Sequence, residues 1–238
     1  MLGKTRNIVG GQVTTKGHGM PRKARLVVPG YAHHITQRGI RGLPTFFSDA
    51  DYRSYLDLFR AQLMKSGLVV YAYCLMPNHV HVVAVPKDES GLSNHFRSLH
   101  SNYAKEVNAS RGWKGHLWQE RFYSVVMDEL HTLAALRYVE LNPVRAGLCD
   151  HPAQWVWSSA RANLGIRYDG IVDTEATKSL VGDWGRYLDS GEDTALRDAL
   201  RRHTRTGRPA GSERFLDELE RMTGKPVRPK KKGPAPRS

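Results

Sequence analysis

The sequence lacks the segments by which membrane and exported proteins are recognised. Its longest apolar run, from Val69 to Pro77, has nine residues and is interrupted by two tyrosines. This is less than half the length that a helix needs to cross a bilayer. The first twenty residues contain no apolar core of a secretory signal. We therefore expect no membrane partner and a cytoplasmic, nucleoid-associated location for a protein that also carries a strong positive charge.

Cysteine is scarce as well, since Cys74 and Cys149 are the only two in 238 residues. They stand 75 residues apart, which gives neither a disulfide framework nor the ligand spacing of a zinc site. Hydrophobic residues make up 40% of the chain, enough for an ordinary core. The chain is therefore expected to fold around packed side chains without covalent or zinc cross-links.

Acidic residues are absent from the first 48 positions, which carry eight Lys and Arg. Residues 203–238 hold ten basic and four acidic residues, whereas residues 49–202 hold 18 and 19. The net charge of +13 therefore lies at the two ends. Such an excess predicts attraction to nucleic acid. Arg outnumbers Lys by 24 to 12, which favours planar, bidentate contacts with phosphates or guanine edges.

Hydrophobic periodicity predicts an alternation of strands and helices along the chain. We expect strands at 31–38, 68–74, 79–85 and 122–127, and helices at 48–67, 90–111 and 128–142. Strand, helix, strand, strand, helix, strand is the order of the split βαβ motif. The fold class predicted is α+β, a ferredoxin-like antiparallel sheet with helices on one face, plus a basic helical C-terminal appendage.

The chain divides into four segments by composition and periodicity. Residues 1–19 read as a flexible arm, and Met20 is a second candidate for the start. The main domain is expected at 20–160, a helical or irregular extension at 161–203, and a basic appendage with a disordered tail at 204–238.

The strongest local pattern is Pro77-Asn78-His79-Val80-His81. On a strand, His79 and His81 would point to the same face, with alpha carbons about 7 Å apart. Two imidazoles at that distance can both reach one metal ion. An isolated pair of this kind is more often exposed to solvent or placed at the edge of a core, so the pattern alone leaves both readings open.

A second pattern lies in the helix expected at 128–142. Tyr138 and Asn142 are four residues apart, hence on one face, and Pro143 would hold Asn142 at the helix end. A tyrosine hydroxyl, with a pKa of about 10, attacks a phosphodiester only beside a polarising cation. His79, His81 and the Asn142 amide would supply ligands for Mg²⁺ or Mn²⁺. Alternatively, the tyrosine packs in the core and the asparagine only ends the helix.

These motifs together resemble a known family. The His-Val-His after a Pro-Asn turn, the helix bearing RYVELNPVRAG and the block GHLWQERFY at 115–123 are similar to those of REP-associated tyrosine transposases. That group belongs to the HUH single-tyrosine transposases. The likeness covers about residues 20–157, and Gly207-Arg208-Pro209 is similar to an appendage found in many such proteins.

The resemblance implies a metal-dependent endonuclease and strand transferase that acts on single-stranded DNA hairpins at repetitive extragenic palindromes. By it, His79 and His81 are the metal ligands and Tyr138 is the nucleophile that takes the 5′ phosphate and frees a 3′ hydroxyl. Asn142 matches a third ligand position. The REP-associated group also implies a monomer.

Basic residues near these motifs are expected to contact DNA. The candidates are Arg22, Lys23, Arg25, Arg38, Arg41, Arg121, Arg137, Lys230, Lys231 and Lys232. Such contacts work by counterion release and make affinity fall steeply with added salt.

Several alternatives stay open from the sequence. Tyr123 is a rival nucleophile, and the adjacent His33 and His34, like His116, are not assigned to the metal. A catalytically silent, ferredoxin-like nucleic-acid-binding protein is the main alternative function. A metal-dependent phosphodiesterase that uses activated water would keep the histidines but would not need Tyr138.

Overall fold

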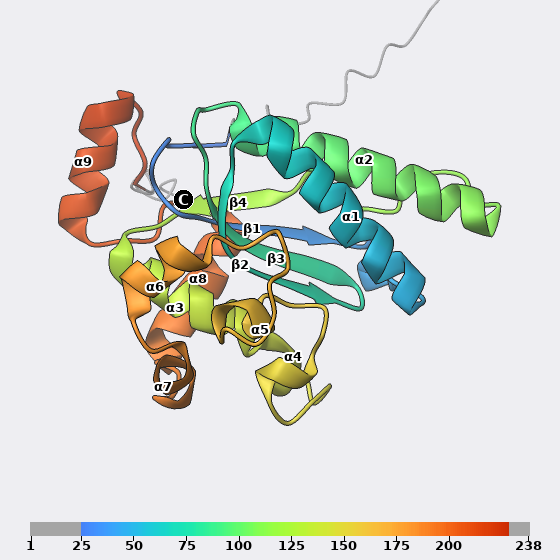
Figure 1. Ribbon diagram of the computed structural model, residues 1–238. Helices are drawn as coiled ribbons and strands as arrows, with labels where there is room; N and C mark the ends of the chain where they lie inside the picture. Colours follow the sequence, from blue (N-terminus) through green and yellow to red (C-terminus); the bar gives the residue numbers. More distant parts are fainter. Residues whose placement is uncertain (1–24, 229–238) are drawn as a thin grey trace, which may run out of the picture.

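The computed structural model of the chain describes residues 25–228, and its centre is a four-stranded antiparallel sheet (Figure 1). The spatial order is β2-β3-β1-β4. The strands are β1 (His33–Arg38), β2 (Val69–Met76), β3 (His79–Val85) and β4 (Tyr123–Val126). The expected arm at 1–19 lies outside the described residues.

Two long helices cover one face of the sheet, α1 (Asp49–Ser66) and α2 (Gly91–Arg111). Helix α1 begins with the capping box formed by Ser48 and Asp51, and Gly67 ends it in the left-handed conformation with φ 60°. The β3 side chains that alternate toward this layer are all apolar and buried: Val80, Val82 and Ala84. This face therefore forms the main hydrophobic core.

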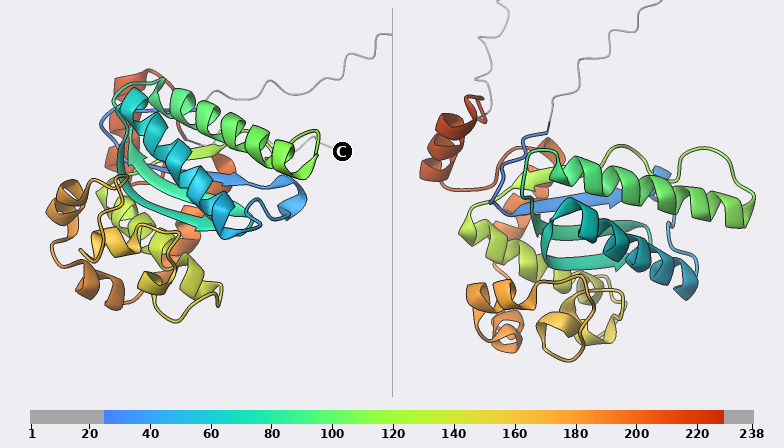
Figure 2. Two further views of the ribbon diagram at one scale, coloured as in Figure 1. Left: turned by 45° about the vertical axis from the view of Figure 1, so that its right-hand side comes forward. Right: turned by 45° about the horizontal axis from the view of Figure 1, so that its top comes forward.

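The opposite face is covered by α3 (Glu129–Glu140) and α8 (Thr194–Thr206). Figure 2 shows the sheet between these helices and the α1–α2 layer. Val83 of β3 points to this side and shares a buried cluster with Leu136 and Leu200. The α+β, ferredoxin-like class is as expected, with both crossover helices on one face. The expectation of helices on one face only is not met, because α3 and α8 bury a second apolar cluster on the other face.

The remaining helices are short and surround this second face. They are α4 (Asn142–Arg145), α5 (Ala160–Asn163), α6 (Thr174–Val181) and α7 (Trp184–Asp189), with single turns η1 (Ile40–Gly42) and η2 (Pro152–Gln154). Within residues 25–228, no helix combines the length and the apolarity that crossing a bilayer would require.

The chain after α8 returns to the edge strand β4. The Ala210 N–H donates to the Val126 carbonyl (2.9 Å), and the Asp128 N–H donates to the Ala210 carbonyl (3.0 Å). Helix α9 (Glu213–Thr223) follows and packs through Phe215 and Leu219. The expected boundary at residue 204 falls inside α8, so the chain passes from extension to appendage within a helix.

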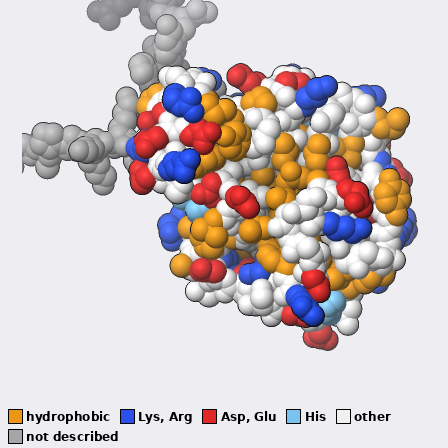
Figure 3. All heavy atoms as spheres, turned by 60° about the vertical axis from the view of Figure 1, so that its left-hand side comes forward, with side chains coloured by type: hydrophobic (Ala, Val, Ile, Leu, Met, Phe, Trp, Pro, Cys, Tyr) orange, Lys and Arg blue, Asp and Glu red, His pale blue; other side chains and the backbone are white. Residues whose placement is uncertain are grey.

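The described part of the basic C-terminal end is largely neutralised. Arg228 forms ion pairs with Glu213 (3.0 Å), Asp217 (2.6 Å) and Glu220 (2.8 Å). Figure 3 shows acidic and basic side chains interleaved on this side of the molecule. The local charge is therefore more even than the composition indicates.

A buried carboxylate holds α3 in place. Glu140, the last residue of α3, is fully buried. It accepts hydrogen bonds from the Ser159 hydroxyl (2.6 Å), the Asn163 amide (2.7 Å) and the Trp184 indole (2.6 Å). Burial raises its pKa to about 7, although the three donors oppose that shift. These bonds connect α3 to α5, α7 and the segment before α5.

Replacing Glu140 with alanine should destabilise the fold strongly. The change removes the acceptor that three buried donors share, and we expect a loss on the order of 3 kcal/mol in the free energy of unfolding. Urea denaturation followed by circular dichroism measures it. Glu129→Ala, in the exposed first turn of the same helix, is the control and should cost less than about 1 kcal/mol. Equal losses in the two variants would contradict the role given to Glu140.

Candidate active site

The two histidines of the His-Val-His pattern lie where β3 passes β1. Both point to the sheet face that α3 and α8 cover, and their ring centroids are 4.9 Å apart. In the antiparallel register, His79 pairs with Arg38 and His81 pairs with Thr36. Alternation along β1 places His34 on the same face. Strand pairing thus gathers side chains that are more than forty residues apart in the chain.

Helix α3 brings Tyr138 to these histidines. The tyrosine side chain is 8% exposed, and its ring centroid lies 5.5 Å from that of His81 and 6.0 Å from that of His34, both edge to face. Together they border a cavity of about 270 Å³. Its lining residues are His34, Thr36, Gln37, Arg38, His79, His81, Tyr138, Leu200, Arg201, Thr204 and Arg205.

The Pro-Asn turn sets the tautomer of His79. The Asn78 amide nitrogen donates to the Gly42 carbonyl (2.9 Å), so its amide oxygen faces His79 Nδ1 at 2.6 Å. An oxygen acceptor there requires the proton on Nδ1, which leaves a lone pair on Nε2. Burial, followed by the charge of Arg38, lowers the pKa of His79 to about 4. His79 is therefore neutral near pH 7, the form that binds metals.

His81 is buried against a third histidine. Its Nδ1 lies 2.9 Å from His34 Nε2, and the two rings stack with centroids 5.1 Å apart. Burial lowers the pKa of His34 to about 3, and it places the pKa of His81 well below its usual value, with smaller contributions from His79 and His34. Both rings are therefore neutral and share one proton across their hydrogen bond.

These donors fit an open divalent-cation site. Within residues 25–228, no three His, Cys, Asp or Glu side chains lie together as a complete cage. Two neutral imidazoles supply nitrogen ligands, which leaves further positions for an amide, water or substrate phosphate, as Mg²⁺ sites commonly have. The residues that could hold the ion are His79 and His81, both through Nε2.

Two arginines flank the tyrosine. The guanidinium carbon of Arg145 lies 4.3 Å from the Tyr138 ring centroid, and that of Arg201 lies 5.7 Å away. Arg145 also donates to the Tyr138 carbonyl and forms an ion pair with Glu192 (2.7 Å). Arg145 is the more buried of the two arginines, so its charge is less hydrated, and burial lowers its pKa. Positive charge of this kind would stabilise a phenolate or a phosphate beside the ring.

Asn142 does not line this cavity. Helix α3 ends at Glu140, and Asn142 begins α4 with Pro143 beside it. Its side-chain nitrogen is buried and has no hydrogen-bond partner among the described residues. The structure therefore brings together His79, His81 and Tyr138 but leaves Asn142 at the neighbouring helix start.

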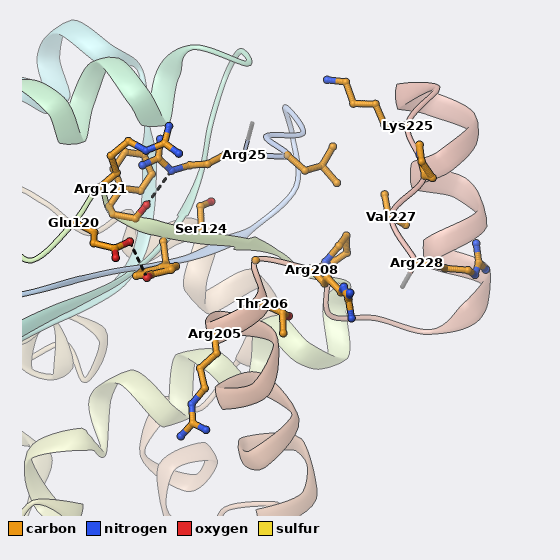
Figure 4. A pocket seen from close by; sticks show the side chains of 16 residues that line it. Arg25, Glu120, Arg121, Ser124, Arg205, Thr206, Arg208, Lys225, Val227 and Arg228 are labelled. Atoms are coloured by element: carbon orange, nitrogen blue, oxygen red, sulfur yellow. Dashed lines mark hydrogen bonds between the residues drawn. The ribbon is translucent and has the colours of Figure 1, made fainter. Parts of the chain in front are cut away.

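A second, cationic cavity of about 420 Å³ adjoins the first one and shares Arg205 with it. Figure 4 shows Arg25 and Arg121 on one side, and Arg208 and Arg228 on the other, from the chain after α8. The guanidinium of Arg25 stacks on Phe122 at 3.7 Å. Burial, together with the charges of Arg121 and Arg97, lowers the pKa of Arg25 to about 10.

The other predicted DNA contacts fall into three groups. Arg38 lines the histidine cavity, and Arg25 and Arg121 line the cationic cavity. Arg41 is exposed on the η1 turn. Outside the described residues lie Arg22, Lys23, Lys230, Lys231 and Lys232.

Arg137 is placed differently from our expectation of a phosphate contact. Its guanidinium donates to the Tyr187 carbonyl (2.9 Å), the Gly191 carbonyl (2.5 Å) and the Ser190 hydroxyl (2.7 Å). It also stacks on the Tyr187 ring at 4.1 Å. The residue attaches α3 to the end of α7 and lies away from both cavities, because helical spacing turns it from the face that carries Tyr138.

Tyr123, the rival nucleophile, lies in β4 and lines the cationic cavity, with its hydroxyl 3.2 Å from Glu120. It does not line the cavity of the two metal-site histidines. The geometry therefore favours Tyr138 as the residue placed for chemistry there.

Several residues that line the cavity are not among those predicted from the sequence. His34 was left unassigned because its neighbour His33 made the pair ambiguous, although alternation with Arg38 could have indicated its face. Arg145 lies beyond the predicted end of the helix at residue 142, so helical spacing from Tyr138 could not place it. No local signal could have placed Arg201, Thr204 and Arg205, since they reach the cavity through tertiary packing of α8.

Comparisons with known proteins find similarity in the segment that carries most of these residues. Residues 33–142 match the family described as "Transposase IS200 like". The matched segment contains His34, His79, His81 and Tyr138, and it covers a little under half of the chain. The segment is thus similar to this family, which confirms the resemblance drawn from the motifs. No curated protein matches the chain.

Two of the solved structures that match the chain are described as transposases. A REP-associated tyrosine transposase bound to a REP hairpin is 17% identical, with a TM-score of 0.52, covering 63% of this chain and 90% of that one. A presumed transposase from Deinococcus radiodurans R1 is also 17% identical, with a TM-score of 0.36 over 50% of this chain and 96% of the other. The first likeness shows a shared fold.

The placement of Arg137 predicts a structural effect without a DNA effect. Arg137→Ala should lower the free energy of unfolding by about 2 kcal/mol, since three hydrogen bonds are lost, and should leave DNA affinity at moderate salt unchanged. Arg38→Ala is the matched opposite, expected to weaken DNA binding without loss of stability. Denaturant titration and fluorescence anisotropy with a labelled hairpin measure both quantities. If the folded Arg137→Ala variant binds DNA more weakly than wild type, Arg137 contacts DNA and this prediction is wrong.

Proposed function

We propose that this chain, which carries an IS200-like transposase domain at residues 33–142, cuts and rejoins single-stranded DNA through a covalent link to Tyr138. The observation that carries the proposal is the meeting of Tyr138 with His79 and His81 in one cavity. A buried tyrosine beside two neutral imidazoles has the arrangement that nucleophilic catalysis of phosphoryl transfer requires.

The proposed reaction exchanges one phosphodiester for another. The Tyr138 hydroxyl oxygen attacks the phosphorus, the P–O3′ bond breaks, and the 5′ phosphate stays on the tyrosine. The phenolic proton passes to solvent, and the leaving 3′ oxygen takes up a proton. Attack by a 3′ hydroxyl from another strand reverses the step and rejoins DNA. Because each step conserves the number of ester bonds, no external energy source is needed.

The residues around Tyr138 have separate tasks in this proposal. His79 and His81 would hold Mg²⁺ or Mn²⁺ through Nε2, and a third position would fall to water or a phosphate oxygen, because Asn142 does not line the cavity. When bound, the cation polarises the phosphoryl oxygens. Arg145 and Arg201 offset the negative charge that develops near the ring.

We propose hairpins of repetitive extragenic palindromes as the DNA that is recognised. The relative with the shared fold is bound to a REP hairpin. In this chain, the cationic cavity beside the histidine cavity supplies a path for the phosphate backbone. Arg25 and Arg121 repel each other there, and a phosphate between them would relieve that repulsion.

Because His79, His81 and Tyr138 of the same chain meet in this cavity, we propose a monomer as the active form. A DNA substrate also fits the proposed location at the nucleoid.

A covalent adduct tests the nucleophile. Wild-type protein incubated with a labelled single-stranded hairpin and Mn²⁺ should give a protein–DNA species that survives denaturation. Tyr138→Phe should reduce its formation by a factor on the order of 10⁴ or more, because the attacking oxygen is absent. Gel electrophoresis of the denatured reaction measures the adduct. Tyr123→Phe is the control and should still form it.

Each alternative has its own signature in this experiment. If Tyr138→Phe forms the adduct and Tyr123→Phe does not, Tyr123 is the nucleophile. Cleavage by wild type with no adduct would indicate an activated water. Binding without cleavage would indicate a silent binding protein. His79→Ala should lose cleavage and keep hairpin binding, whereas parallel loss of both would show a structural histidine.

The salt dependence of hairpin affinity tests whether the DNA backbone passes through the cationic cavity. Replacing exposed Arg121 with glutamine should weaken hairpin binding severalfold and reduce the slope of log affinity against log salt by about 0.7 to 0.9. The control is Arg53→Gln, because Arg53 is an exposed residue of α1 that lines neither cavity. An unchanged slope in Arg121→Gln would exclude the cationic cavity from the DNA path.

A further inference from the structure

Helix α8 lies outside the matched transposase segment, yet it forms one wall of the histidine cavity. Leu200, Arg201, Thr204 and Arg205 all line that cavity. Leu200 is 1% exposed and packs in the same buried cluster as Tyr138. The helix therefore contacts the active-site region by packing as well as by polar groups.

A continuous hydrogen-bond chain runs from α8 to His81. The Thr204 hydroxyl oxygen lies 2.8 Å from the Leu200 carbonyl and 3.2 Å from His34 Nδ1. His34 Nε2 in turn lies 2.9 Å from His81 Nδ1. His34 is 1% exposed and His81 is 6% exposed, so water does not replace these partners readily.

The Leu200 carbonyl sets the direction of this chain, because a carbonyl only accepts. The Thr204 hydroxyl donates its one proton to the Leu200 carbonyl, at the shorter of its two distances. Toward His34 it then offers only lone pairs, so His34 carries its proton on Nδ1. The free Nε2 of His34 accepts from His81 Nδ1–H. The lone pair on His81 Nε2 is left for a cation.

The opposite direction would disable His81. If Thr204 donated to His34, the His34 proton would lie on Nε2 and point at His81 Nδ1. His81 would then carry its proton on Nε2, and that nitrogen would have no lone pair for a metal.

We infer that Thr204 of α8 is a positioning residue of the active site: through His34 it holds His81 in the tautomer that binds the metal. The inference rests on the proposed function, in which His79 and His81 hold a divalent cation. Asn78 serves His79 within the β2–β3 turn, whereas His81 depends on a helix more than a hundred residues away.

The position of α8 is itself secured by ion pairs at its start. Glu192, which precedes the helix, pairs with Arg145 of α4 (2.7 Å) and with Arg197 of α8 (3.5 Å). The same Arg145 stacks on Tyr138. The helix is thus attached to the catalytic domain at its first turn, at Leu200 and at Thr204, which keeps the hydroxyl in register with His34.

The test compares Thr204→Val with Thr204→Ser in the full chain. Valine keeps the shape of threonine but removes the hydroxyl, whereas serine retains it. Titration calorimetry with Mn²⁺ alone should show affinity falling about 2- to 10-fold in Thr204→Val, the effect of one lost buried hydrogen bond, and remaining near wild type in Thr204→Ser. His34→Phe should lose about 10- to 100-fold.

A second measurement determines the tautomer of His81 in the absence of metal. Long-range proton–nitrogen NMR spectra of wild type and Thr204→Ser should show the His81 proton on Nδ1, and Thr204→Val should move it partly to Nε2. Thr206→Val, on the same helix with its hydroxyl bonded to the His203 carbonyl, is the control and should change neither measurement.

Two results would overturn the inference separately from the proposed function. One is Mn²⁺ binding by wild type with equal affinity in Thr204→Val and Thr204→Ser. The other is a wild-type His81 that carries its proton on Nε2. If wild type binds no Mn²⁺, the proposed metal site fails, and the inference fails with it.

Discussion

The burial of the Glu140 carboxylate is the constraint on which the arrangement of the active-site region depends. An uncompensated carboxylate in a protein interior costs several kcal/mol, so α3 lies where three donors reach Glu140: the side chains of Ser159, Asn163 and Trp184. Tyr138 is two residues earlier on the same helix. With Glu140 held there, the Tyr138 ring lies against His81 and borders the cavity that His79 also lines.

The two faces of the sheet have different roles: one forms the main hydrophobic core, and the other carries the candidate catalytic residues. Against α1 and α2 the strands bury a mainly apolar layer, which supports β1 and β3 from that side. On the other face the same strands carry polar side chains in the gap between α3 and α8. Burial there keeps the imidazoles of His34, His79 and His81 neutral, and each ring has a hydrogen-bond partner that fixes its tautomer. The covering helices thus both enclose the site and prepare its ligands.

The positive charge of the chain has a different distribution in space than in sequence. Composition placed it at the two ends, with a balanced middle. In the fold, Arg145 and Arg201 from that middle flank Tyr138, while Arg228 near the C-terminal end is neutralised by three carboxylates. Arg25 and Arg121, far apart in sequence, meet beside Phe122. A division into basic arms that hold DNA and a neutral centre that cuts it is therefore too simple for the described residues.

The amino-acid sequence alone accounts for the local structure, because periodicity, caps and turn residues act over a few residues. It set the strand that aligns His79 with His81, the capping box at Ser48 and the helix that carries Tyr138. Packing between distant segments settles three further features: His34 faces the site and its neighbour does not, Arg137 bonds to the end of α7 and lines neither cavity, and Thr204 reaches His34. Those outcomes depend on how helices pack across the sheet, which buried contacts between distant segments decide and no local pattern records.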